Sequence, residues 1–255
     1  MAKSHNWTRE QTIVAFNVYC KIPFKNSNKA HPTIIKYANI IGRSTSALNM
    51  KIGNIGRLDP ELRKRGITGL ANGAKLEKVI WDEFHGNWEE LAYESERLIS
   101  QFQNKTIIET NQIDLTDLPE GKDVERLIKT RVNQNFFRSS VLSAYYQKCC
   151  ITGIEISDLL VASHIIPWCL NKEQRINPRN GLCLNSIHDQ AFDKGFLTIT
   201  TDYKIKISDA IFEHKENQSI ADLFLKYNKQ KITLPDKFIP SQEFLKYHND
   251  NIFRG

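Results

Sequence analysis

The sequence lacks the features that mark secreted and membrane proteins. Its opening residues, MAKSHNWTRE, contain no apolar core and no small-residue cleavage site. No window approaches the roughly 18 apolar residues that a membrane-spanning helix requires. Cysteine is scarce, and five residues at irregular spacing do not suggest a disulfide framework. These absences predict a cytoplasmic protein with reduced thiols and no membrane partner.

Internal repeats and low-complexity tracts are also absent, and the composition is that of an ordinary globular protein. Of 255 residues, 40% are hydrophobic and 25% are charged, which suits one large domain or two ordinary ones. The net charge of +6 permits a polyanionic partner but also occurs in proteins that never bind nucleic acid. The positive charge falls in two blocks, residues 1–100 and 121–180, which flank an acidic segment at 101–120.

The first hundred residues have the pattern of a helical domain. Thr8 and Gln11 stand at capping-box spacing, Pro32 suits a first helical turn, and Ser44 can cap a further helix. An inward stripe of that last helix consists of Leu48, Ile52 and Ile55. Its outer face is then expected to carry Arg43, Ser46, Asn49, Lys51 and Asn54.

Two short helices joined by a tight glycine-containing turn are the parts of a helix-turn-helix. The pattern favours a module that contacts double-stranded DNA through Arg43, Ser46, Asn49 and Lys51. The alternative is a plain helical bundle, since any bundle contains such a pair of helices.

We predict three parts in the chain: a helical DNA-recognition domain at 1–102, a polar and acidic linker at 103–121, and a second domain at 122–255. The linker loses helical periodicity and ends in Pro119 and Gly121, which both break regular structure.

The second domain opens with a basic and aromatic helix. Arg131, Gln134 and Arg138 lie on one face of it. Arginine in this arrangement suits phosphate or guanine recognition, although a solvated surface has the same pattern.

A histidine stands between apolar residues and a proline in the stretch ASHIIPW, residues 162–168. Taken alone, such a histidine is more often structural than catalytic. The segment LLVASHII reads as a strand, GLCLN as a second strand, and a helix that Ser186 can cap follows. Asp189 and Asp193 are four positions apart in that helix, so they project from the same face. FLTIT and YKIKIS then predict a hairpin.

The motifs ASHIIPW, NPRNGLCL and HDQAFDKG, with CITG ahead of them, resemble those of the HNH endonucleases. His164, Asn180 and Asp189 follow one another at intervals of 16 and 9 residues, similar to the spacing of that family's signature positions. The resemblance covers roughly residues 122–207. It implies an α+β protein, in which an all-α, helix-turn-helix-like domain precedes a nuclease domain of the ββα-metal fold. The wider chain resembles bacterial HNH proteins of the restriction-endonuclease type.

The resemblance implies a role for each matching residue. His164 corresponds to the general base that activates water, and Asn180 to the residue whose amide holds the loop and the imidazole in place. Asp189 corresponds to a ligand of a divalent metal, and Asp193, one turn later on the same face, is expected to be a second ligand or a group that contacts the ligands. Carboxylates are hard oxygen donors, which favours Mg²⁺ or Mn²⁺.

The chain departs from the family pattern at three points. Ser163 stands where relatives often have a metal-binding aspartate, so we expect it to be a weaker ligand. His188 is adjacent to Asp189 and is an alternative participant, although helical phase favours Asp189. Many relatives also hold a structural zinc with two pairs of cysteines, which we do not expect here, because those places are taken by Cys150, Gly153, Asn185 and His188.

The predicted function is a metal-dependent endonuclease that hydrolyses phosphodiester bonds in double-stranded DNA, with a role in restriction or antiphage defence. One base and one metal cut one strand, so double-strand cleavage predicts a homodimer or two successive encounters. Two alternatives stay open: a DNA-binding regulator with an inactive HNH-like domain, and a nuclease that acts on RNA or on structured nucleic acid.

Overall fold

The computed structural model describes residues 6–25, 27–67, 75–114 and 122–255. It divides into two compact units, Met1–Ser140 and Val141–Gly255. The predicted linker, 103–121, contains a short helix, α7 (Ile107–Asn111), and its last part, 115–121, lies outside the described residues. The division between the units falls within α8 (Lys122–Ala144), whereas the domain boundary predicted before residue 122 stays a prediction.

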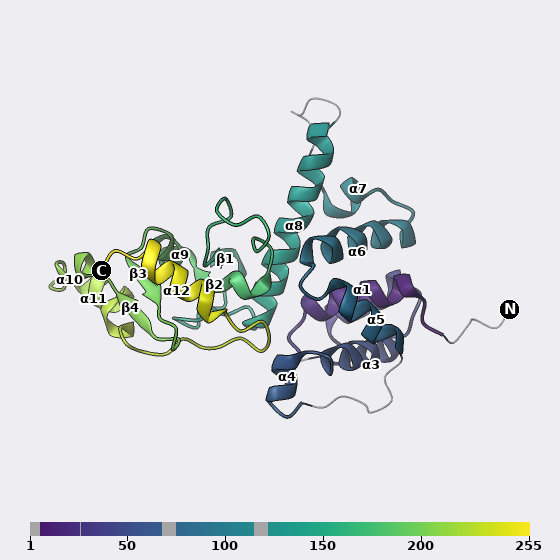
Figure 1. Cartoon of the computed structure of the whole chain (residues 1–255), viewed down its shortest axis with the longest axis horizontal. Helices are drawn as coiled ribbons and strands as arrows, with labels where there is room; N and C mark the ends of the chain where they lie inside the picture. The colour runs from purple at the N-terminus through teal and green to yellow at the C-terminus, as the bar shows by residue number, and fades with distance from the viewer. Residues whose placement is uncertain (1–5, 26, 68–74, 115–121) are drawn as a thin grey trace. The chain divides into compact units, whose positions relative to one another are not determined.

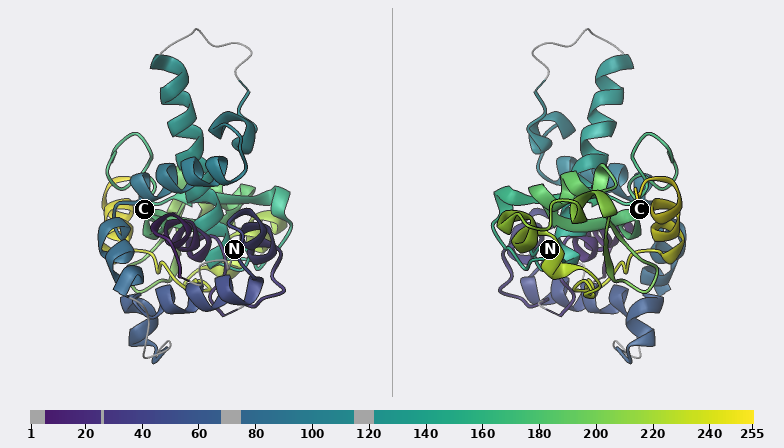
Figure 2. Two further views of the ribbon diagram at one scale, coloured as in Figure 1. Left: turned by 90° about the vertical axis from the view of Figure 1, so that its right-hand side faces the viewer. Right: turned by 90° about the vertical axis from the view of Figure 1, so that its left-hand side faces the viewer.

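Helices make up the regular structure of the first unit (Figure 1). They are, besides α7 and most of α8, α1 (Arg9–Cys20), α2 (Pro32–Ile40), α3 (Thr45–Gly56), α4 (Pro60–Lys64), α5 (Lys75–Phe84) and α6 (Trp88–Phe102). Figure 2 shows the first turns of α8 projecting past the other helices of this unit. Within the described residues, no helix is long and apolar enough to cross a bilayer.

The helix starts in this unit follow the predicted signals. The Thr8 side chain accepts a hydrogen bond from the Gln11 backbone and the Gln11 side chain accepts one from the Thr8 backbone, which confirms the capping box. Pro32 occupies the first position of α2, and Ser44 caps α3. Helix α1 is buried from Thr12 onward, because it packs against α6, α3, α5 and α2. It is the centre of the core of this unit.

The outer face of α3 is not open as expected. Lys51 is only 4% exposed, and its ammonium lies 2.7 Å from a carboxylate oxygen of Glu77, which belongs to α5 and is 1% exposed. Asn54 donates a hydrogen bond to the same oxygen at 3.3 Å. The prediction that Lys51 faces outward is therefore wrong, because α5 covers this part of α3.

Two other predicted DNA contacts of this helix pair also have partners inside the unit. Arg43 donates hydrogen bonds of 3.0 and 2.7 Å to Gln11 Oε1 and lies 5.0 Å from the centre of the Trp7 ring. Asn49 accepts a hydrogen bond from the Ser27 hydroxyl. Ser46 is exposed. Helical spacing defined a common face, but it did not show what packs against that face.

The second unit is built on a strand, loop, strand and helix, as predicted. Strand β1 (Leu160–His164) pairs antiparallel with β2 (Gly181–Asn185), with His164 opposite Gly181, and α9 (Ser186–Asp193) packs on both strands. The predicted hairpin forms as β3 (Leu197–Ile199) and β4 (Ile205–Ile207). Beyond it lie α10 (Asp209–Phe212), α11 (Gln218–Leu223) and α12 (Gln242–Asn251), the last packed on β3. Together the two units make an α+β chain.

The start of α9 differs from the prediction by one residue. Asn185, rather than Ser186, is the cap, and its side-chain oxygen accepts hydrogen bonds from the backbone of Ile187 and His188. Both residue types suit a helix start, so the sequence did not distinguish them. The helix phase is unaffected, and Asp189 still lies in its first turn.

Candidate active site

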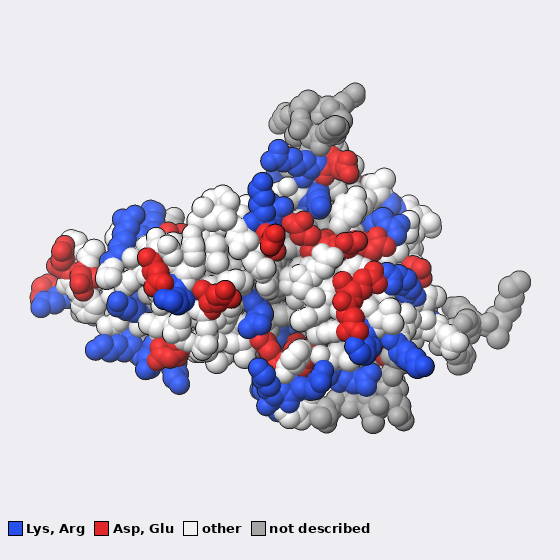
Figure 3. Space-filling view, in the orientation of Figure 1, with Lys and Arg blue, Asp and Glu red and all other residues white. Residues whose placement is uncertain are grey.

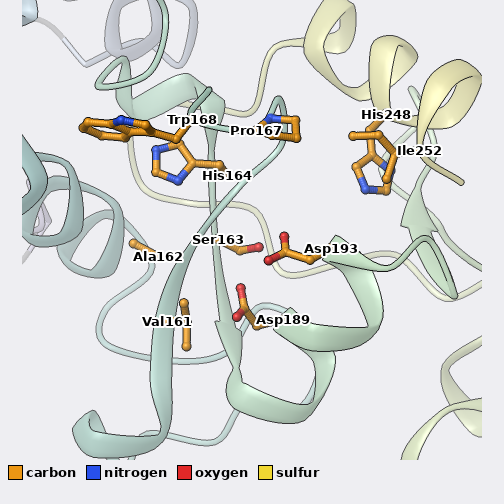
Figure 4. Close-up of a pocket in the computed structure, with 10 residues that line it drawn as sticks. All are labelled: Val161, Ala162, Ser163, His164, Pro167, Trp168, Asp189, Asp193, His248 and Ile252. Carbon is orange, nitrogen blue, oxygen red and sulfur yellow. The ribbon is translucent and has the colours of Figure 1, made fainter. Parts of the chain in front are cut away.

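Four of the five predicted site residues of the second unit, Ser163, His164, Asp189 and Asp193, line one cavity of about 410 Å³, and the fifth, Asn180, is not among its lining residues. Strand β1 contributes Ser163 and His164, α9 contributes Asp189 and Asp193, and the loop after β1 contributes Trp168. Figure 4 shows the two carboxylates turned toward the Ser163 hydroxyl, whereas the His164 imidazole extends toward Trp168. The structure therefore brings the three predicted metal ligands together and places the predicted base on another part of the same wall.

The pKa values of both carboxyl groups are raised above their ordinary value. Partial burial and then the negative charge of Asp189 raise the pKa of Asp193 to about 6, although Asp193 is exposed at the cavity surface. Burial also raises the pKa of Asp189, and the nearby Ser163 hydroxyl opposes that rise. No described Lys or Arg forms an ion pair with either aspartate.

The donor set fits a hard divalent cation. Ser163 Oγ is buried and has no hydrogen bond of normal geometry with the described residues. It faces two carboxylates that a cation would stabilise in their ionised form. Within the described part of the chain, no group of three or more His, Cys, Asp or Glu side chains is placed to hold a metal. Water and substrate oxygens would have to complete the coordination shell, which is the usual situation for Mg²⁺.

His164 is held in one protonation pattern by the backbone. Its Nε2 lies 2.8 Å from the carbonyl oxygen of Arg175. A carbonyl can only accept, so Nε2 carries the proton and Nδ1 is the basic nitrogen of the neutral ring. Burial lowers the pKa of His164, and the hydrogen bond to Arg175 partly opposes this. The neutral form, which a general base requires, is favoured at neutral pH.

Asn180 fixes the backbone that leaves β1. Its side chain accepts a hydrogen bond from the Ile166 N–H at 2.8 Å and donates one to the Ile166 carbonyl at 3.1 Å. Its own carbonyl accepts from the Ile165 N–H at 2.9 Å. Asn180 is fully buried. These three bonds tie the two residues after His164 to the start of β2, and they support the positioning role that the resemblance implies.

His188 faces away from this cavity. It is buried beside Phe224 and Tyr227, and its Nε2 donates to the Leu223 carbonyl at 2.8 Å. Helical phase predicted this direction. Asn185 stands at one of the positions where the family resemblance implies zinc-binding cysteines. Here it donates hydrogen bonds to the Thr152 hydroxyl at 3.2 Å and to the Cys149 sulfur at 3.7 Å.

Sequence reasoning assigned no role to two residues that line the cavity, Trp168 and His248. Trp168 packs perpendicular to the His164 ring, with 5.5 Å between ring centres. His248, on α12, stacks on Phe192 with 3.7 Å between ring centres and hydrogen-bonds the Phe192 carbonyl at 3.2 Å. Trp168 directly follows the strand and Pro167, and this position could have identified it from the sequence as a neighbour of His164. No sequence pattern identifies His248, because its contacts join distant parts of the chain.

The residues that follow His248 hold the other end of α9. The Arg254 N–H donates to the Gly195 carbonyl at 2.9 Å, and a side chain at Gly195 would collide with the Ile252 carbonyl. Gly195 also has a φ of +74°, which favours glycine. The carboxyl end of α9, which carries Asp193, is therefore positioned by residues 248–254.

The predicted DNA contacts on α8 belong to the first unit. Arg131, Gln134 and Arg138 are all exposed, and Arg131 donates a hydrogen bond to Gln134 at 3.3 Å. Figure 3 shows Lys and Arg side chains along α8 with acidic side chains beside them. Their contact with DNA stays a prediction.

Comparison with known families bears on the second unit. A family model described as HNH endonuclease matches residues 149–200, a segment that contains β1, β2, α9 and β3. No curated protein was found to match the chain. The matched segment includes Ser163, His164, Asn180, Asp189 and Asp193, and the chain therefore carries a domain of the HNH endonuclease family.

Proposed function

We propose that this chain is a metal-dependent DNA endonuclease that acts in restriction or antiphage defence. One observation carries the proposal: a single cavity is lined by the two carboxylates of α9, a buried hydroxyl and a histidine held in the form that can accept a proton. This is the chemistry that phosphodiester hydrolysis requires.

In the proposed mechanism, His164 takes a proton from water at Nδ1, so that hydroxide attacks the scissile phosphorus. The bond from phosphorus to one sugar oxygen then breaks, and that oxygen leaves as a hydroxyl after taking a proton from water. Asn180 keeps the imidazole in place by fixing the backbone that follows it. Asp189 and Asp193, with Ser163, hold Mg²⁺ or Mn²⁺. Such an ion, when bound, stabilises the negative charge that develops on the phosphate oxygens.

The proposed substrate is double-stranded DNA. The face of α8 with Arg131, Gln134 and Arg138 is the strongest candidate contact, because all three are exposed, whereas only Ser46 is exposed among the four residues proposed on the α2 and α3 pair. A homodimer would supply the second base and metal site needed to cut both strands.

The test is cleavage of supercoiled plasmid with Mg²⁺ or Mn²⁺, on unmodified, methylated and hydroxymethylated DNA. Wild type should nick, and His164→Ala should bind DNA as before while nicking at least about 10²-fold more slowly, since general-base catalysis contributes about 10²- to 10⁴-fold. His214→Ala is a matched control, because His214 is exposed on the same unit. Linear product that appears with increasing protein concentration would support the homodimer.

Ser163 favours a second candidate, a DNA-binding regulator with an inactive domain. With serine at position 163, the cavity has two carboxylates, whereas an aspartate there would add a third and strengthen metal binding. If wild type binds duplex DNA and nicks none of these substrates with either metal, the regulator replaces the nuclease. Cleavage of RNA in preference to duplex DNA, measured by competition, would instead make the substrate RNA.

A further inference from the structure

Arg175 contacts the candidate base directly through its backbone and indirectly, through Trp168, with its side chain. Its backbone carbonyl accepts the hydrogen bond from His164 Nε2. Its guanidinium lies 5.1 Å from the centre of the Trp168 indole, within cation–π range. Trp168 in turn packs perpendicular to the His164 ring. The three residues therefore form a closed set of contacts around the imidazole.

These contacts fix two separate properties of the ring. The carbonyl determines which nitrogen carries the proton. The indole restricts rotation of the imidazole, because an edge-to-face aromatic contact has a preferred geometry. Neither is set by Asn180, whose hydrogen bonds reach the backbone of residues 165 and 166.

The segment between Trp168 and Arg175 is exposed at several positions, including Cys169, Leu170 and Lys172. Its described hydrogen bonds are local: Asn171 accepts from the Gln174 N–H at 3.1 Å. The contact of the guanidinium with Trp168 links the far end of this loop to its start. This contact therefore helps to fix the position of the Arg175 carbonyl.

We infer that the Trp168 and Arg175 side chains are positioning residues that hold His164 in the Nε2-protonated form, with its basic nitrogen directed for proton transfer. The inference rests on the proposed role of His164 as general base. Arg175 acts through Trp168 and the loop, and it touches neither metal nor substrate in this role.

The first test is the ¹⁵N spectrum of the imidazole of His164 in the full-length protein at pH 7.5, assigned by its loss in His164→Gln. Wild type should show one protonated and one unprotonated ring nitrogen. In Trp168→Ala and Arg175→Ala, both signals should move toward the average of two tautomers. Trp168→Phe and Arg175→Lys should retain the wild-type pattern, and Lys172→Ala is the control within the same loop. This readout needs no activity, so it separates the inference from the proposed function.

The second test is nicking kinetics with the same variants. The alanine variants should lower kcat by about tenfold or more and change KM by less than about twofold, and the two conservative variants should restore most of kcat. A raised KM with unchanged kcat would identify Arg175 as a DNA contact and overturn the inference. An unchanged ¹⁵N pattern in both alanine variants would also overturn it, whatever their activity. Where Arg175→Ala does not fold, Arg175→Gln, which removes the charge but keeps a long side chain, replaces it in both tests. Where Trp168→Ala does not fold, Trp168→Leu, which removes the aromatic ring but keeps an apolar side chain, replaces it.

Discussion

The two units surround their carboxylates in different ways. In the first unit, two largely buried carboxylates meet cations of the protein itself, as Glu77 meets Lys51 at 2.7 Å and Glu96 meets Lys21 at 2.8 Å. In the second unit, Asp189 and Asp193 face each other and have no ion pair with the described residues. The first arrangement is complete within the fold. Under the proposed function, the second would be completed by an external cation, which would distinguish a structural charge from one available for chemistry.

The largest expected effect is on cleavage. Asp189→Asn keeps the shape of the side chain but removes a charge that the proposed cation needs, so nicking should fall by about 10²- to 10³-fold. Melting temperature should stay level or rise, because the repulsion of Asp193 is also removed. The measurements are plasmid nicking and thermal unfolding, with exposed Asp209→Asn as the control. If the melting temperature and the activity both fall, Asp189 has a structural role like that of Glu77.

The next effect is on stability in the first unit. Lys51→Met leaves Glu77 buried without its partner, which should lower the free energy of unfolding by about 3–5 kcal/mol. Replacing both residues, as Lys51→Met with Glu77→Leu, should restore most of the loss, since no buried charge remains. Denaturant unfolding measures this. If Lys51→Met instead unfolds like wild type but weakens DNA binding, Lys51 is a DNA contact after all and the contrast between the units fails.

The smallest effect is the pH dependence of the second unit. The pKa of Asp193 is raised from 3.8 to about 6 in the folded state. The metal-free folded state therefore binds this proton more tightly than the unfolded state does, and protonation stabilises the fold. That contribution to stability is lost as pH rises from about 4 to about 6. Added Mg²⁺ should then stabilise the protein more at pH 7 than at pH 5, because ligands must be ionised. Thermal unfolding with and without Mg²⁺, repeated on Asp193→Asn, measures it; equal stabilisation at both pH values would contradict the proposed ligand.

The sequence was sufficient where the determining contacts are local. The capping box of Thr8 and Gln11 lies within one helical turn, and Asp189 and Asp193 share a face because of helix geometry alone. The order of strand, loop, strand and helix followed from short apolar runs and turn residues. The match to the HNH family confirms the resemblance that these motifs suggested.

Sequence reasoning failed where distant segments meet. Lys51 is buried because α5, which begins at Lys75, packs on α3, and no spacing within α3 predicts that. The contact of Arg175 with His164 depends on the path of an irregular loop, which has no periodicity to read. Asn185 and Ser186 both suit a helix cap, and only the strand pairing that ends at Asn185 decides between them.

The attachment of α9 to residues 248–254 has a consequence for synthesis of the protein. His248 lies 56 positions after Phe192, so a ribosome must add and release that much more polypeptide before the helix end beside Asp193 can settle. The helix end beside Asp193 therefore stays unsettled until these residues have left the ribosome. Under the proposed function, a chain that stops short of them would carry both carboxylates but lack the contacts that position the second one.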